Sequence, residues 1–270
     1  MNHNSPTHNS DSVQAQFDST GARRIEAVYL TPDVVAQREN ALRMLAPQAG
    51  ERGLDIGCGP GLTSLALGQA VGAKGWVHAV DIAEPMLALA RARCQACPQV
   101  QLGLADVTQL PHPDHCFDLA LATQVYEYVP QLDQALLELR RVLRPGGRVL
   151  LVDTDWASAV WASRDDTRMR RVIDTWNQHV PWPQLPRSLQ QRLQQAGFAH
   201  VQVEVMPLLN TRFDPNTYSA GMLDVIGGFV SGRDGLPAET VADWQADVRS
   251  MDQSTGYFFS LNRYVFTATA

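Results

Sequence analysis

Apolar and amphipathic segments alternate along the chain from about residue 50 to residue 206. Five short apolar runs have the length and composition of buried strands, and they cover 52–57, 75–82, 100–106, 117–123 and 148–155. Helical spacing of the apolar residues predicts helices over 31–46, 62–71, 84–96 and 132–144. Apolar strands joined by helices favour a parallel sheet that is covered on both faces, so the pattern predicts an α/β fold.

The pattern changes after residue 155. The spacing of Met169, Val172, Ile173 and Trp176 predicts a helix, a shorter helix is expected over 187–196, and 199–206 has the pattern of a sixth strand. Two further helices are expected within 213–256, and the aromatic and β-branched segment 257–270 predicts a last strand. The expected parts are a flexible tail (1–20), a helical cap (21–50), a core (51–206) with a helical substrate-side segment (156–185), a helical lid insertion (207–256) and a final core strand (257–270).

Length and charge limit the classes of partner. The 270 residues suffice for one large domain, and the net charge of −6 argues against nucleic acid, which is bound by clustered Lys and Arg. No apolar run is long enough to cross a bilayer, and the polar first twenty residues lack a signal core, so we expect no membrane insertion and a cytoplasmic location. Cys94 and Cys97 form a lone C-x-x-C, and His112, His115 and Cys116 are interpreted as loop residues, so no metal site is expected.

The stretch LDIGCGPG, residues 54–61, forms a glycine-rich turn between the first strand and the next helix. Gly57, Gly59 and Gly61 are spaced G-x-G-x-G, whereas a dinucleotide-binding turn would need its third glycine at Leu62. Asp55 lies near the end of the same strand, where a carboxylate is unfavourable beside a pyrophosphate but suits an ammonium or a sulfonium. The turn therefore favours a cationic ligand over a dinucleotide.

Two further carboxylates follow at strand ends. Asp81 ends the second strand, where it can accept hydrogen bonds from both hydroxyls of a ribose. Asp106 ends the third strand, where it can accept one from an adenine amino group. Together with Asp55 they line the carboxyl edge of the sheet, which is the ligand-binding edge of open α/β folds.

With these residues in place, the chain resembles a known family. The segments LDIGCGPG, VDIAEPML, LADVTQLP, FDLALA and ELRRVLRPGGRVLL look like the successive motifs of class I S-adenosylmethionine-dependent methyltransferases. They most resemble the small-molecule group that includes the ubiquinone and menaquinone biosynthesis methyltransferases. The resemblance covers about residues 25–206 and implies a Rossmann-like seven-stranded sheet with an antiparallel last strand. It also implies S-adenosyl-L-methionine as cofactor and S-adenosyl-L-homocysteine as product.

The resemblance assigns the cofactor site by position. The three glycines would let the backbone approach the methionine part of the cofactor, and Asp55 would hold its amino group. Arg38 of the front helix would pair with the tail carboxylate, a geometry that suits a guanidinium. The predicted cofactor residues are Tyr29, Arg38, Asp55, Gly57, Gly59, Gly61, Asp81, Ile82, Met86, Asp106, Val107 and Thr123.

The acceptor side follows the fourth and fifth strands. Tyr126, Trp156 and Trp161 are candidates for substrate contact, with core packing as the alternative for each. His179, Tyr126 and Asp155 are candidates for catalysis, although a histidine at a helix end also fits a structural role. The aromatic and Met content of the covering segments predicts a small, partly apolar acceptor, and the lid helices also allow a homodimer.

The leading hypothesis is thus a methyltransferase that acts on a small molecule by direct displacement. A methyltransferase acting on protein or nucleic acid, and a non-catalytic S-adenosylmethionine-binding module, remain as alternatives. A nicotinamide oxidoreductase is disfavoured by Asp55 and Leu62.

Overall fold

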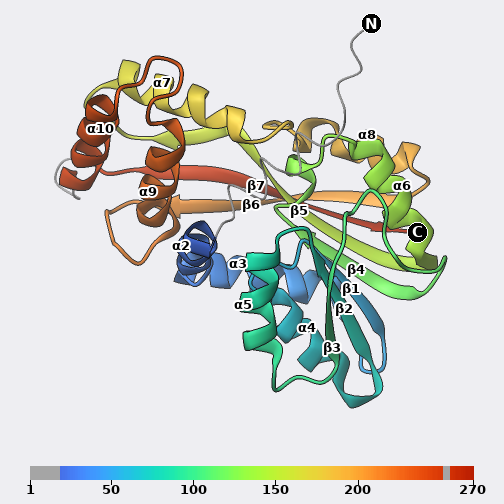
Figure 1. Cartoon of the computed structure of the whole chain (residues 1–270). Helices are drawn as coiled ribbons and strands as arrows, with labels where there is room; N and C mark the ends of the chain where they lie inside the picture. Colours follow the sequence, from blue (N-terminus) through green and yellow to red (C-terminus); the bar gives the residue numbers. More distant parts are fainter. Residues whose placement is uncertain (1–18, 252–255) are drawn as a thin grey trace, which may run out of the picture.

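Seven strands form one sheet in the order β3-β2-β1-β4-β5-β7-β6, in a computed structural model that describes residues 19–251 and 256–270 (Figure 1). Strands β1 to β5 pair in parallel, and β7 is antiparallel to both β5 and β6. The strands are β1 (Arg52–Ile56), β2 (Trp76–Asp81), β3 (Val100–Leu104), β4 (Phe117–Thr123), β5 (Leu143–Trp161), β6 (Ala199–Asn210) and β7 (Phe259–Thr269). The predicted seven-stranded Rossmann-like fold with an antiparallel last strand is confirmed.

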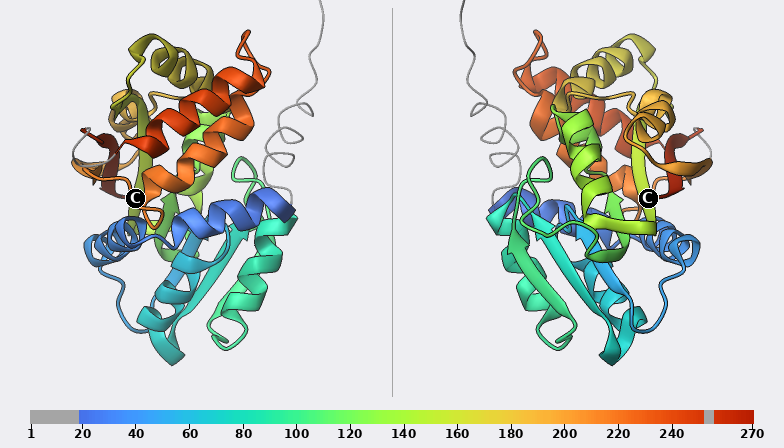
Figure 2. Two further views of the ribbon diagram at one scale, coloured as in Figure 1. Left: turned by 90° about the vertical axis from the view of Figure 1, so that its left-hand side faces the viewer. Right: turned by 90° about the vertical axis from the view of Figure 1, so that its right-hand side faces the viewer.

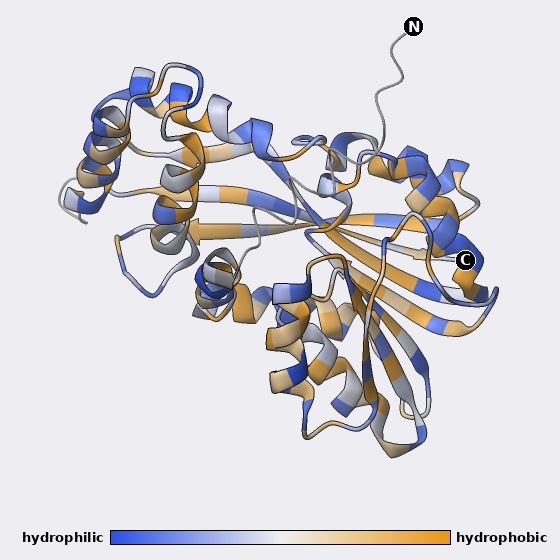
Figure 3. Ribbon diagram, viewed as in Figure 1, coloured by the Kyte–Doolittle hydropathy of each residue, from blue (hydrophilic) through white to orange (hydrophobic). Residues whose placement is uncertain are grey.

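Helices cover both faces of this sheet, as apolar parallel strands require. One face carries α3 (Pro32–Leu45), α4 (Leu62–Val71) and α5 (Glu84–Cys94), and the other carries α6 (Leu132–Val142) and α8 (Pro186–Gln195). Leu67 of α4 packs on Val77 and Leu119 of the sheet, and all three side chains are fully buried. Figure 3 shows the apolar residues concentrated along the strands, while the helices carry mixed faces.

A second helical group packs at the end of the sheet where β5, β6 and β7 extend beyond the other strands (Figures 1 and 2). It consists of α2 (Ser19–Tyr29), α7 (Asp166–Trp176), α9 (Tyr218–Val230) and α10 (Ala238–Ser250). Trp244 of α10 is fully buried there and meets Trp161 at the end of β5 edge to face, with ring centroids 5.7 Å apart. Short 3₁₀ turns cover Gly72–Lys74, Tyr126–Tyr128 and Asn177–His179.

Two strand ends differ from the expected ones. Residues 156–161 continue β5 rather than starting a helix, because Val160 and Trp161 pair with Ser260 and Phe259 of β7 across a bulge. β6 runs on to Asn210 through Pro207, which an edge strand tolerates because a ladder hydrogen bond need not be donated there. The expected lid therefore begins later than residue 207.

The front of the chain holds a second helix, which lies mostly within the expected helical cap (21–50). α2 begins at Ser19, inside the segment expected to be a flexible tail, and the rest of that tail (1–18) lies outside the described residues. Thr31 precedes α3 as expected, with Pro32 as the first helical residue, but its hydroxyl donates to the carbonyl oxygen of Val28 instead of capping α3. Among the described residues, helices are too short or too polar to cross a bilayer.

Candidate functional site

A cavity of about 330 Å³ opens at the carboxyl ends of β1, β2 and β4, beneath α3. The loops after these strands form its floor, and Tyr29 of α2 and residues of α3 form its roof. Eleven of the twelve predicted cofactor residues line it, namely Tyr29, Arg38, Asp55, Gly57, Gly59, Asp81, Ile82, Met86, Asp106, Val107 and Thr123. The carboxyl edge therefore gathers residues from positions 29 to 123 into one site.

The three glycines of the turn have different surroundings, although each has a positive φ. A Cβ atom at Gly57 would lie 2.3 Å from Cγ2 of Val125, and one at Gly61 would lie 2.9 Å from Cα of Ala90 in α5. At Gly59 a Cβ atom would meet nothing within 4 Å. Gly57 and Gly61 thus allow close packing within the protein, whereas Gly59 faces open space, and Gly61 does not line the cavity.

Asp55 lies beneath the turn with 3% of its surface exposed. Its Oδ2 atom accepts a hydrogen bond of 2.6 Å from the Ser64 hydroxyl at the start of α4. Burial raises the pKa of this carboxyl to about 7, and the hydrogen bond from Ser64 only partly opposes the shift. A cationic group in the cavity would favour the ionised form, so Asp55 is suited to an ammonium.

Asp81 ties the glycine turn to the next loop. Its two carboxylate oxygens accept backbone N–H groups of Gly59 and Ala83, each at 2.8 Å. Burial still raises its pKa above the usual range for an aspartate. Each oxygen keeps a lone pair for a further donor, such as a hydroxyl of a ligand.

Asp106 occupies the outer end of the cavity and is exposed. Its Oδ1 atom accepts the backbone N–H and the hydroxyl of Thr108, which fixes the loop after β3. The other carboxylate oxygen is directed to no described donor and is available to a ligand.

Arg38 brings positive charge to the opposite wall. Its Nη1 atom donates to the carbonyl oxygen of Tyr29 at 3.1 Å, and burial lowers the pKa of its guanidinium. The ion pairs between described residues do not include it. A half-buried guanidinium with one carbonyl partner can still bind a carboxylate of a ligand in bidentate fashion.

Several polar residues of the cavity wall were not predicted, among them Gln37, Gln124 and Arg263. Arg263 lies on β7 and donates from Nη1 to Oε1 of Gln37 on α3, at 2.8 Å. The one sequence signal was that this arginine is the single charged residue of the segment 257–270. Its contact spans 226 residues of sequence, so local patterns do not reveal the partner.

The structure corrects the expected substrate contacts. Tyr126 is fully buried in the core under α6 and does not line the cavity, whereas Tyr128 does. The 3₁₀ turn that holds both tyrosines directs their side chains to different sides. Trp156 and Trp161 are 5% exposed and belong to the apolar cluster under α7, α9 and α10. All three side chains are thus packed in apolar clusters.

The other catalytic candidates also lie away from the cavity. Asp155 is held by Arg187, whose Nε atom donates to its Oδ2 at 2.9 Å. His179 stacks on the Trp176 ring at 3.7 Å, and its Nδ1 donates to the carbonyl oxygen of Trp176. Burial lowers the pKa of His179 to about 3, so the imidazole stays neutral and serves packing.

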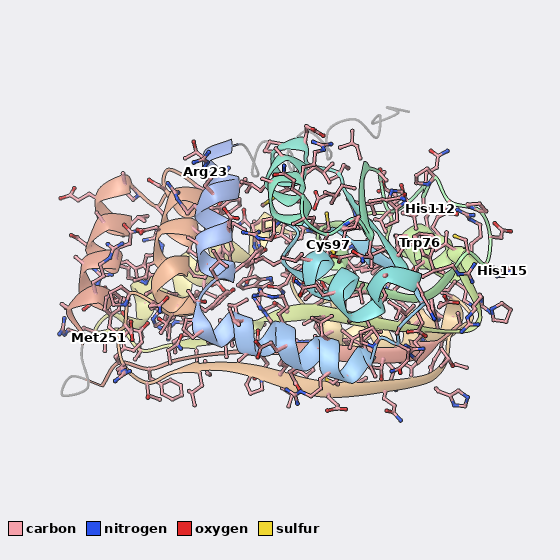
Figure 4. The ribbon with its side chains drawn as sticks, turned by 90° about the horizontal axis from the view of Figure 1, so that it is seen from below. Arg23, Trp76, Cys97, His112, His115 and Met251 are labelled. Carbon is pink, nitrogen blue, oxygen red and sulfur yellow. The ribbon has the colours of Figure 1, made fainter. Side chains whose placement is uncertain are left out.

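The described part of the expected lid segment and the histidines His112 and His115 do not line the cavity. The described residues between 207 and 251 contribute no lining to the cavity, and the role of this segment as a lid stays a prediction. His112 packs edge to face on His78 and Phe117, and Figure 4 shows His112 and His115 near Trp76, at the opposite end of the molecule from Met251. The described residues contain no group of three or more His, Cys, Asp or Glu side chains arranged to hold a metal ion.

Comparison with known proteins agrees with this geometry. Residues 54–151, from β1 into β5, match a family described as a methyltransferase domain. The match covers 98 of the 270 residues and confirms the predicted resemblance to this family.

Individual relatives match less than half of the chain. An uncharacterized 37.1 kDa protein in a transposon of Streptomyces fradiae is 41% identical over 117 residues, which are 43% of this chain and 34% of that protein. A demethylmenaquinone methyltransferase of Lysinibacillus sphaericus is 32% identical over 120 residues, which are 44% of this chain and 51% of that protein. The matches thus span a third to about half of these relatives.

The fold extends the likeness beyond the methyltransferase domain. A structure of phosphoethanolamine N-methyltransferase 2 from Haemonchus contortus superimposes with a TM-score of 0.65 and covers 97% of this chain and 60% of that one. The sequence identity is 19%, so this likeness concerns the fold alone.

Proposed function

We propose that this protein transfers the methyl group of S-adenosylmethionine to a small, partly apolar molecule. The observation that carries the proposal is the set of three carboxylates, Asp55, Asp81 and Asp106, along one cavity that also holds Arg38. Phosphate-binding sites instead surround their ligand with backbone N–H groups and basic side chains. The cavity has the charge distribution of a site for a cationic nucleoside with an amino-acid tail.

The donor set fits each part of this cofactor. Asp81 has free lone pairs for ribose hydroxyls, and the free oxygen of Asp106 suits an adenine amino group. The ammonium of the tail would stabilise the ionised form of Asp55, whose pKa burial raises. Arg38 is placed to pair with the tail carboxylate, and Gly59 leaves room for close approach to the backbone.

The relatives support the same cofactor and a small acceptor. The matched Lysinibacillus protein is named a demethylmenaquinone methyltransferase, and the Haemonchus enzyme was solved with S-adenosylhomocysteine and a phosphorylated amine. Both names describe enzymes that methylate small molecules. The acidic chain, with its net charge of −6, gives no support to a nucleic-acid acceptor.

When bound, the cofactor would supply a methyl group on a sulfonium, which is a good leaving group. The protein then has to align the acceptor with that methyl group and exclude water. Tyr29, Tyr128 and Val129 line the cavity as large or apolar side chains, and both tyrosine hydroxyls have pKa values raised by burial. They stay neutral at physiological pH and act as walls and hydrogen-bond partners rather than as bases.

Calorimetric titration tests the cofactor half of this proposal. We expect the wild-type protein to bind S-adenosylhomocysteine and not NAD. The same preparation is then screened with candidate acceptors for consumption of S-adenosylmethionine. Binding of NAD alone would contradict the proposal and would indicate that the glycine turn binds a dinucleotide. Tight cofactor binding with no turnover of any small molecule would instead favour the non-catalytic module.

A further inference from the structure

Arg263 is a buried guanidinium at the inner end of the cavity. Only 2% of its surface is exposed, and it lines the cavity from β7. Nη1 donates to Gln37, but Nε and Nη2 are buried without a hydrogen-bond partner among the described residues. Leaving charged donors buried and unpaired is costly, so a ligand oxygen at this position would relieve an existing penalty.

Neighbouring residues hold the guanidinium in place. Nε2 of Gln37 donates to the carbonyl oxygen of Met206 at 2.9 Å, which turns the other end of the amide, Oε1, toward Arg263. The ring of Tyr218 lies against the opposite side, with its centroid 5.0 Å from Cζ of Arg263. Residues of α3, β6, β7 and α9 thus fix one orientation of the side chain, as recognition of a specific group requires.

Two buried carboxyl groups interact electrostatically with Arg263, namely Asp153 on β5 and Glu127 in the 3₁₀ turn Tyr126–Tyr128. Glu127 and Asp153 are each fully buried, and burial raises their pKa values while the charge of Arg263 lowers them. Oε2 of Glu127 accepts from the Trp156 indole at 3.2 Å, and the ion pairs among described residues do not join either carboxylate to Arg263. Without a direct ion pair to either carboxyl group, Arg263 keeps two donors, Nε and Nη2, for a ligand oxygen.

Arg263 and Arg38 serve different parts of the cavity. Arg38 is half buried and is held by the backbone at the junction of α2 and α3. Arg263 is held by Gln37, the residue directly before Arg38 in α3, and lies against β6 and α9. The tail carboxylate of the cofactor needs one guanidinium, which leaves the second without a cofactor group to bind.

We propose that Arg263 binds an anionic oxygen of the methyl acceptor, so that the substrate is an organic acid with an apolar body. This inference rests on the proposed function, because it assigns the acceptor side of the same cavity. Val34, Val129 and Met206 provide apolar walls near the polar group. A neutral acceptor would leave the buried guanidinium unpaired. The site should therefore bind a neutral acceptor more weakly than the loss of one hydrogen bond alone would predict.

The experiment uses a matched pair of small probes, benzoate and benzamide, which have similar shape and differ in charge. Protein is first saturated with S-adenosylhomocysteine, and that titration alone decides whether the cofactor half of the proposed function holds. Each probe is then titrated into the complex by calorimetry. We expect benzoate to bind at least about ten times more tightly than benzamide, the size of effect that a charge-assisted bidentate pair gives.

Variants assign the preference to one arginine. Arg263→Gln should abolish the benzoate preference and leave the affinity for S-adenosylhomocysteine within about threefold, whereas Arg263→Lys should keep part of the preference. Arg38→Gln is the matched control, and it should weaken S-adenosylhomocysteine binding and spare the preference. Melting temperatures of all variants report on folding, and the wild-type comparison of the two probes stands even if Arg263→Gln does not fold.

Two results would overturn the inference. Equal affinity of the wild-type complex for benzoate and benzamide, or no binding of either, would show that Arg263 recognises no acceptor anion. A loss of S-adenosylhomocysteine binding in Arg263→Gln as large as in Arg38→Gln would show that Arg263 holds the cofactor tail instead. In both cases cofactor binding by the wild type would leave the proposed methyl transfer standing.

Discussion

The carboxylate of Asp81 accepts the backbone N–H of Gly59, 22 positions earlier in the chain, at 2.8 Å. The bond joins the end of β2 to the turn after β1, so one side chain both shapes the glycine turn and presents oxygens to the cavity. Loop geometry and ligand binding therefore depend on the same carboxylate.

Asp81→Asn should reduce the affinity for S-adenosylhomocysteine about 100-fold. The amide NH2 group of asparagine replaces one carboxylate oxygen, so it can no longer accept a hydrogen bond from a backbone N–H or a ribose hydroxyl at that position. The free energy of unfolding should fall by about 1–2 kcal/mol from the weakened turn. Calorimetry and urea denaturation measure the two effects. Asp133→Asn, at an exposed carboxylate paired with Arg192, is the matched control and should change neither; an unaltered affinity in Asp81→Asn would remove Asp81 from the site.

Asp55 should link cofactor binding to pH. Its pKa of about 7 in the folded protein exceeds the ordinary value of 3.8, so folded protein keeps a proton that the unfolded chain loses. Stability therefore falls as pH rises from about 4 to about 7. The ammonium of the ligand should then displace this proton, so binding at pH 6 releases up to one proton more than binding at pH 8.

Calorimetry of S-adenosylhomocysteine binding in buffers with different ionisation enthalpies counts these protons. Asp55→Asn is the control, because an amide has no proton to lose, and it should remove the difference between pH 6 and pH 8. The same proton release in the variant would assign the linkage to another group, such as Asp81, whose pKa is also raised by burial.

The sequence predicted those parts of the site whose signals are local. Asp55, the glycine turn and Asp81 each follow a strand with a clear apolar run, and strand ends of a parallel sheet meet at one edge. Arg263 and Gln37 are 226 positions apart, and the continuation of β5 to Trp161 depends on pairing with Phe259. Such contacts are set by how distant segments pack, which periodicity along one segment does not report.

The structure places the aromatic candidates Trp156 and Trp161 in an apolar cluster for a related reason. Trp156 and Trp161 follow a strand at the carboxyl edge, which made them candidates for ligand contact. The strand continues past that edge, however, and carries both indoles into the cluster under α7, α9 and α10. An aromatic residue near a binding edge has no preferred role until the course of its backbone is known.

Gly57 and Gly59 offer a matched pair of substitutions. Gly57→Ala should cost about 2–4 kcal/mol of unfolding free energy, because alanine is disfavoured at φ of 60° and its methyl group would overlap Val125. Gly59→Ala has a similar φ but open space, so it should cost about 1–2 kcal/mol and mainly reduce cofactor affinity. Urea denaturation compares the two variants.

Adding Val125→Ala to Gly57→Ala should recover about 1 kcal/mol or more, since the double change removes the overlapping methyl groups. The loss from backbone strain at residue 57 should persist. Strictly additive effects of the two substitutions would show that the cost of Gly57→Ala comes from φ alone.

His179 should prove dispensable for methyl transfer, although histidine is the residue type that most often serves as a general base. Its pKa of about 3 in the folded protein is far below the ordinary 6.5, so folded protein resists a proton that the unfolded chain binds. This group therefore lowers stability as pH falls from about 6.5 toward 3.

His179→Phe keeps the stacking on Trp176, loses the hydrogen bond to the carbonyl oxygen of Trp176, and cannot be protonated. We expect the variant to bind S-adenosylhomocysteine like wild type and to lose less stability between pH 6.5 and pH 5, measured by urea denaturation at each pH. A variant that binds cofactor and acceptor normally but transfers methyl groups at least about 100 times more slowly would restore His179 as a general base, since that is the effect of removing one.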